Sequence, residues 1–137
     1  MPLQSLVAAR ILLASRTRKT AASDPGKRGF ALDKAGHLMY ASHQSYEHDA
    51  MLGSEQCDLL VKLLRSREHA GLYGARITGG GAGGTVALLA DNSDRASEAI
   101  LDAMCEYEKQ SGNKPELLDG SSAGAWHAGT ALVPRIS

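Results

Sequence analysis

The residues best suited to chemistry lie in one short loop, residues 79–84, where every position except Ala82 is glycine. A glycine costs roughly 0.5–1 kcal/mol of conformational entropy relative to alanine, and a plain hairpin turn needs only one or two of them. Without a Cβ, however, backbone N–H groups can approach an anion, most often a phosphate, at short range. The pattern therefore favours a phosphate-binding loop over the alternative, a long flexible hairpin.

Candidate binding residues fall into two groups. The first is the loop together with the threonines at its ends, whose hydroxyls add hydrogen-bonding groups: Thr78, Gly79, Gly80, Gly81, Ala82, Gly83, Gly84 and Thr85. The second is Ser42, His43 and Tyr46, which fall on one side of a predicted helix and would face a substrate pocket. A histidine on a short helix is more often a structural hydrogen-bonding group, which is the alternative for His43. His43 and His48 diverge on a helix, so we expect no metal pair, and no residue is assigned a catalytic role.

The glycine spacing matches several phosphate-binding patterns incompletely. Gly79-x-Gly81-x-x-Gly84 has the dinucleotide spacing, but that motif needs a helix at its third glycine, and residues 85–89 have the composition of a strand. With Val86 added, the pattern has the form of the protein-kinase glycine loop, yet the sequence lacks the other motifs of that fold. No Lys-Ser or Lys-Thr pair follows the glycines, which excludes a Walker A loop.

The loop is expected to connect two strands, residues 72–77 and 85–89, in a small sheet. Amphipathic helices are predicted from about Glu55 to Glu68 and from Asp94 to about Gln110, since each has apolar residues at i, i+3, i+4 and i+7. The two stripes are Cys57, Leu60, Val61 and Leu64, and Ile100, Ala103, Met104 and Tyr107. Ser54 is a good N-cap for the first of these helices. Two helices of similar length against a mostly antiparallel sheet form an α+β sandwich with the helices on one face.

The remaining segments carry weaker signals. A short, polar helix is predicted from Lys34 to about Glu47, and further strands over residues 116–119 and 129–133. Residues 1–28 are interpreted as a basic N-terminal helix, about residues 3–16, followed by a linker that contains the turn tripeptide Asp24-Pro25-Gly26. The domain proper is therefore expected to comprise residues 29–137.

Length and charge restrict the class of protein. With 137 residues the chain can bury one core. Its 15 basic and 15 acidic side chains cancel, giving a pI near 7.0, which argues against a nucleic-acid or anionic-membrane binder. No run of about 18 apolar residues occurs, so no membrane span is expected. Cys57 and Cys105 each fall on an apolar helical face, which is typical of a reduced, cytoplasmic protein.

Residues 74–86, Gly-Ala-Arg-Ile-Thr-Gly-Gly-Gly-Ala-Gly-Gly-Thr-Val, resemble the third motif of the GHMP kinases almost position for position. Residues 38–46, Leu-Met-Tyr-Ala-Ser-His-Gln-Ser-Tyr, and residues 53–61, Gly-Ser-Glu-Gln-Cys-Asp-Leu-Leu-Val, are similar to the sugar kinases of that family, galactokinase and L-arabinokinase in particular. Residues 119–125 also resemble the final strand region of the arabinokinase-like members. The resemblance covers about residues 30–137.

The resemblance implies a ferredoxin-like C-terminal kinase domain. The complete kinase would use ATP and Mg²⁺ to phosphorylate a sugar hydroxyl, with residues 79–84 closing over the phosphates. The family's second phosphate loop, of the type Pro-x-x-x-Gly-Leu-Gly-Ser-Ser, belongs to the N-terminal domain and is not found in this sequence. We therefore expect a partner N-terminal kinase domain, in the same or a separate chain. Alone, this chain is expected to be inactive and to bind neither ATP nor Mg²⁺ tightly.

An alternative comes from another functional class. The chain would then be a stand-alone module that binds a sugar or nucleotide without catalysis, or that forms a homodimer over its open face. The two hypotheses differ in whether the isolated chain binds ligand. The sequence does not identify the sugar, because the resemblance places most substrate-selecting residues in the N-terminal half.

Overall fold

The computed structural model describes residues 10–13, 25–79, 84–119 and 129–131. The expected strand over residues 129–133 is not formed by residues 129–131, which have no regular structure, and its other residues lie outside the described part. Along the chain the elements are β1 (Arg10–Leu13), α1 (Pro25–His48), α2 (Glu55–Arg65), the 3-10 helix η1 (Glu68–Ala70), β2 (Leu72–Ile77), β3 (Thr85–Ala90), α3 (Asp94–Ser111) and β4 (Glu116–Leu118).

The four strands of the described chain form one sheet in the order β2-β3-β1-β4. β2 and β3 are antiparallel, whereas β1 runs parallel to both β3 and β4. The α+β class is confirmed, and the element order follows the ferredoxin-like β-α-β-β-α-β pattern with one helix added. Because two helices, α1 and α2, separate β1 from β2, β1 enters the sheet reversed. The sheet is therefore mixed rather than mostly antiparallel.

The N-terminal segment differs from the expected helix and linker. Residues Arg10–Leu13 form a strand between β3 and β4, because a short apolar run is compatible with either structure and strand pairing decides between them. The long helix α1 begins at Pro25, within the predicted linker. Proline is well suited to the first position of a helix, where its missing N–H has no helical partner.

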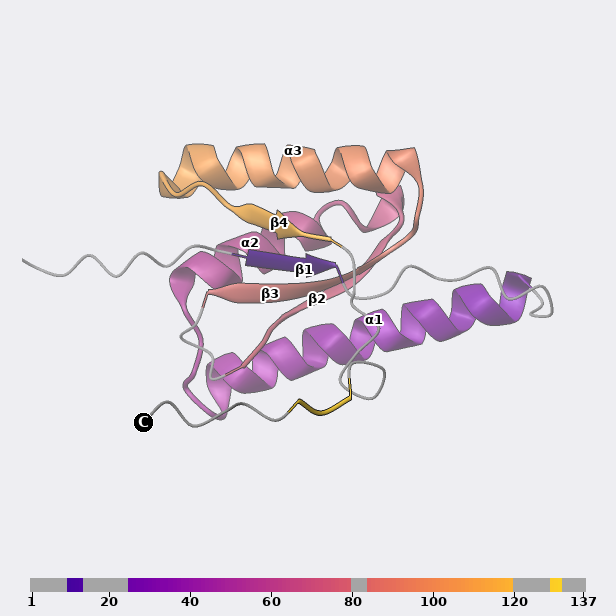
Figure 1. The fold of residues 1–137 in the computed structure, drawn as a ribbon, viewed down its shortest axis with the longest axis horizontal. Helices are drawn as coiled ribbons and strands as arrows, with labels where there is room; N and C mark the ends of the chain where they lie inside the picture. The colour runs from indigo at the N-terminus through magenta and orange to yellow at the C-terminus, as the bar shows by residue number, and fades with distance from the viewer. Residues whose placement is uncertain (1–9, 14–24, 80–83, 120–128, 132–137) are drawn as a thin grey trace, which may run out of the picture.

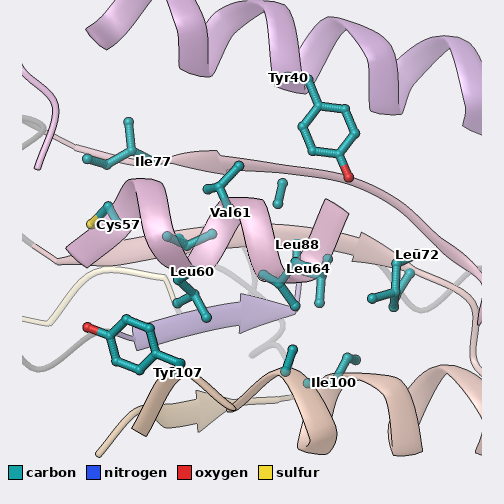
Figure 2. Packing of buried hydrophobic residues seen from close by; sticks show 14 of the residues in the cluster. Tyr40, Cys57, Leu60, Val61, Leu64, Leu72, Ile77, Leu88, Ile100 and Tyr107 are labelled. Atoms are coloured by element: carbon teal, nitrogen blue, oxygen red, sulfur yellow. The ribbon is translucent and has the colours of Figure 1, made fainter. Parts of the chain in front are cut away.

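The three longer helices surround the sheet in distinct ways. Figure 1 shows α2 behind the strands, with α3 along one side of the sheet and α1 along the other, next to β2. The predicted α2 stripe is confirmed, since all four of its residues are buried. In α3 the predicted residues Ile100, Ala103 and Tyr107 are buried, and Met104 is partly buried. Figure 2 shows the four stripe residues of α2 together with Ile100 and Tyr107 of α3, in one cluster with Leu72, Ile77 and Leu88 from the strands.

Helix termini follow the local sequence signals. The side chain of Ser54 accepts a hydrogen bond from the N–H of Cys57 and caps α2, as predicted. Ser93 caps α3 in the same way, and Gly112 ends it in the left-handed conformation that suits glycine. None of the helices in the described part of the chain has the length and apolar character needed to cross a lipid bilayer.

Candidate functional site

The glycine loop begins and ends on a hydrogen-bonded stem. The N–H of Thr78 donates to the carbonyl of Thr85 at 3.0 Å, and the Thr78 hydroxyl is 3.3 Å from the same oxygen. Gly79 and Gly84 have φ angles of 69° and 71°, a conformation that side chains rarely adopt. Glycine is therefore required at both ends of the loop. The candidate residues Gly80, Gly81, Ala82 and Gly83 lie outside the described residues.

His43 links three elements beneath the start of the loop. Its Nδ1 accepts a hydrogen bond from the N–H of Ile77 at 3.1 Å, and its Nε2 lies 2.9 Å from Oδ1 of Asp58. Since Nδ1 is the acceptor, the proton of the neutral ring belongs on Nε2, next to the Asp58 carboxylate. His43 is only 6% exposed, so its ring lies mostly inside the domain, where both ring nitrogens have partners.

Tyr46 contacts the loop itself. Its hydroxyl donates to the carbonyl of Gly79 at 3.2 Å. The guanidinium of Arg76 lies over the Tyr46 ring, 5.5 Å from its centroid, while Arg76 Nε donates to the Ile77 carbonyl at 3.1 Å. The third residue of the group, Ser42, is half-buried. The structure therefore brings Tyr46 to the loop and places His43 below it.

The first turn of α2 lies beside the end of the loop. Cys57 is fully buried there, and this burial raises the pKa of its thiol, while a backbone hydrogen bond from Gly84 acts in the opposite direction. The N-terminus of a helix carries a partial positive charge. The described ends of the loop, the start of α2 and the end of α1 thus meet at one end of the domain.

A surface groove of about 260 Å³ runs between α1 and α2 on the other side of the His43–Asp58 pair. Acidic and basic residues both line it: Tyr40, His43, Gln44, Glu47, Asp58, Val61, Lys62 and Arg65. The described residues contain no cluster of three or more potential metal ligands. They therefore supply no ligand set for Mg²⁺, and no step is assigned to the metal here.

Asp58 was not among the sequence candidates, although it contacts His43 directly. The sequence feature that could have identified Asp58 is its position, one helical turn after the N-cap Ser54 and on the side of α2 that faces α1. On α1, the positions 36, 40, 43 and 47 recur at helical spacing and mark the face that contacts β2 and α2. This face contains a glycine, a tyrosine, a histidine and a glutamate, so hydrophobic periodicity does not detect it.

Asp58→Asn is expected to change how stability depends on pH. Burial, and secondarily Glu47, raise the pKa of Asp58, against a lowering by His43. A carboxyl whose pKa is raised on folding favours the folded state below its unfolded pKa of about 3.9 and loses this contribution as pH rises through the folded value. Asparagine keeps an oxygen next to Nε2 of His43 but does not ionise. Urea unfolding from about pH 4 to 7 should therefore show the wild type losing stability relative to the variant.

The matched control is Asp33→Asn, which removes an exposed carboxylate from α1. The stability difference between this variant and the wild type should vary much less over the same pH range. If the wild type instead gains stability relative to Asp58→Asn as pH rises, attraction to His43 outweighs burial, and the expected sign is wrong.

Comparisons with known proteins add a family assignment. The family model described as GHMP kinases C terminal matches residues 29–110. L-arabinokinase of Arabidopsis thaliana is 39% identical over 111 residues, covering 76% of this chain and 11% of the arabinokinase. Galactokinase of Chloroflexus aggregans is 31% identical over 112 residues, covering 82% of this chain and 28% of that enzyme. Galactokinase of Mycobacterium tuberculosis strain H37Rv is 44% identical over 64 residues, covering 47% of this chain and 16% of that enzyme.

The chain thus spans less than a third of the length of these relatives. No solved structure matches it significantly.

Proposed function

We propose that this chain, which belongs to the GHMP kinase family and matches the family's C-terminal domain, is the C-terminal part of an ATP-dependent sugar kinase. The observation that carries this proposal is the glycine loop, residues 79–84, on a hydrogen-bonded stem within the matched segment. The relatives named galactokinase and L-arabinokinase support a sugar as the phosphoryl acceptor. We propose the anomeric hydroxyl as the reacting group.

The proposed reaction is an in-line phosphoryl transfer. The sugar hydroxyl oxygen forms a bond to the γ-phosphorus of ATP, the bond to the bridging oxygen of ADP breaks, and the hydroxyl proton leaves for a base that this chain does not supply. Such transfers depend chiefly on positioning and charge stabilisation. The loop N–H groups would contribute here by facing the phosphate oxygens, and Mg²⁺ would arrive with ATP.

The proposed partner is an N-terminal kinase domain that carries the second phosphate loop. Two observations support this proposal. The chain covers only 11% of the length of the arabinokinase and 28% of the length of the Chloroflexus aggregans galactokinase. Its sequence also contains no Gly-Leu-Gly-Ser-Ser segment. Because Cys57 and Cys105 are both free thiols, we further propose a reducing compartment, the cytoplasm.

Two measurements test the proposed function. The coding region upstream is expected to encode a Gly-Leu-Gly-Ser-Ser type loop, in the same or an adjacent frame. An assay of ADP release with ATP, Mg²⁺ and either galactose or arabinose should detect no turnover by the isolated chain, because half of the phosphate site is missing. Robust turnover by this chain alone would refute its proposed incompleteness.

Titration calorimetry separates the kinase part from a stand-alone module. The isolated chain is expected to give no measurable heat with MgATP or with either sugar. Saturable binding of one of these ligands, combined with no upstream kinase sequence, would favour the non-catalytic binding module. Sedimentation in the same buffer reports whether the chain is a homodimer.

A further inference from the structure

The outer edge of β2 has an unusual set of hydrogen-bond partners. Among the described residues β2 is the edge strand of the sheet, so its outward N–H and C=O groups face no other described strand. Buried backbone polar groups nevertheless need partners. The helix α1 runs along this edge (Figure 1), where His43 accepts a hydrogen bond from the buried N–H of Ile77. Just past the end of β2, Tyr46 donates one to the carbonyl of Gly79.

One helix can make both contacts because of the spacing of His43 and Tyr46. Residues three apart on a helix lie on one face, roughly 4.5 Å apart along the axis. Their partners are also close in the chain, because Ile77 is the last residue of β2 and Gly79 lies in the turn that follows it. His43 and Tyr46 therefore hold the last residue of β2 and the first residue of the glycine loop at the same time.

Asp58 completes the arrangement by fixing the histidine. Its Oδ1 lies 2.9 Å from Nε2 of His43, which keeps the proton on Nε2 and leaves Nδ1 as the acceptor for Ile77. The side chain of His43 is 8% exposed and that of Asp58 is 30% exposed. The pair is thus shielded enough for its hydrogen bonds to set the ring orientation.

We propose that His43, held by Asp58, and Tyr46 are positioning residues that set the start of the glycine loop for phosphoryl transfer. This inference rests on the proposed function for its catalytic meaning, but its geometry belongs to the chain alone. The clamp is defined as His43, Tyr46 and Asp58. It acts through the backbone of Ile77 and Gly79.

The clamp depends on the protonation state of His43. A second proton on Nδ1 would replace the acceptor by a donor facing the Ile77 N–H. The charged groups around the His43–Asp58 pair are Glu47 and His48 on α1 and Lys62 and Arg65 on α2, and Arg76 on β2 lies over the neighbouring ring of Tyr46. Asp58 would stabilise the added charge, but a proton on Nδ1 should still break the hydrogen bond from the Ile77 N–H.

Two substitutions separate the functions of the two ring nitrogens. The amide oxygen of asparagine replaces Nδ1 as acceptor, whereas the amide nitrogen of glutamine replaces Nε2 as donor. In native-state hydrogen exchange of the chain, followed by NMR, His43→Asn should retain the protection of the Ile77 amide. His43→Gln should lower that protection roughly tenfold, because one hydrogen bond is lost.

Tyr46→Phe tests the second contact. It removes the hydroxyl but keeps the ring beneath Arg76. The carbonyl carbon of Gly79 should shift upfield, as expected for a lost hydrogen bond, while the Ile77 amide stays protected. An unchanged Gly79 resonance would remove Tyr46 from the clamp.

The wild-type chain supplies a measurement that does not depend on a variant folding. Across the titration of the His43 ring, followed by its own resonances, the protection factor of Ile77 should fall in parallel while the amides of α3 stay unchanged. Equal protection in His43→Asn and His43→Gln, or no coupling to the titration, would overturn the proposal. Because none of these readouts needs kinase activity, they separate failure of the clamp from failure of the proposed function. In the complete kinase, His43→Gln should lower kcat and leave the KM for the sugar unchanged, and His43→Asn should restore kcat.

Discussion

Gly36→Ala is expected to lower the free energy of unfolding by about 3 kcal/mol, although alanine is the better helix former by about 1 kcal/mol. The reason is the contact between α1 and β2. A Cβ at position 36 would overlap the carbonyl group of Tyr73, and one at position 74 would lie 2.5 Å from the Cα of Gly36. Both obstacles are backbone atoms, so no side-chain rotation relieves them.

The expected consequence extends to the candidate site. To accept the methyl group, α1 must move away from β2, and it carries Tyr40 and His43 with it. Chemical denaturation followed by circular dichroism measures the loss of stability. Hydrogen exchange at Ile77 then reports whether the hydrogen bond to His43 is lost as well.

Gly29→Ala is the matched control in the same helix. Apart from the backbone of its own helix, no described part of the chain comes within 4 Å of a Cβ placed there, so only helix propensity and chain entropy operate. This variant should be more stable by about 0.5–1 kcal/mol. If Gly36→Ala is equally stabilising, the close approach of α1 to β2 does not exist in solution.

The segments that the sequence predicts well are those governed by local rules. The strands on either side of the glycine loop, the apolar stripe of α2 and the serine cap at Ser54 all depend on residues within a few positions of one another. Hydrophobic periodicity and capping chemistry determine such features directly. The family resemblance adds only the expected arrangement of these elements.

The features that sequence reasoning missed depend on distant partners. Arg10–Leu13 forms a strand because it pairs with β3 on one side and β4 on the other. No local sequence pattern predicts that pairing. Pro25 and Gly26 favour a turn when considered alone, yet they begin α1. Composition therefore favoured a loop over residues that the structure places in a helix.

The candidate site shows the same division between local and distant causes. The need for glycine at positions 79 and 84 follows from the backbone and was visible in the composition. The inward orientation of His43 was not, because it requires Ile77 from β2 and Asp58 from α2 to be in place. A buried polar link between three elements has no periodic signature.

Leu60→Ala is the second variant for which we expect a large effect. Leu60 is completely buried on α2, and Figure 2 shows it among side chains of the sheet and of α3. Truncation to alanine removes its apolar contacts and leaves a cavity, which costs about 3 kcal/mol. Thermal unfolding followed by circular dichroism should show a melting temperature lower by roughly 10 °C.

The control for this variant is Leu101→Ala, which removes the same atoms from a side chain on α3 that is 55% exposed. Its effect should stay below about 0.5 kcal/mol, because little apolar surface is lost from the interior. The pair also tests whether the isolated chain folds without a partner. If the isolated chain has a formed core, Leu60→Ala lowers the melting temperature and Leu101→Ala does not. Equal effects, or a broad transition without a melting temperature, would mean that the core does not form in the isolated chain.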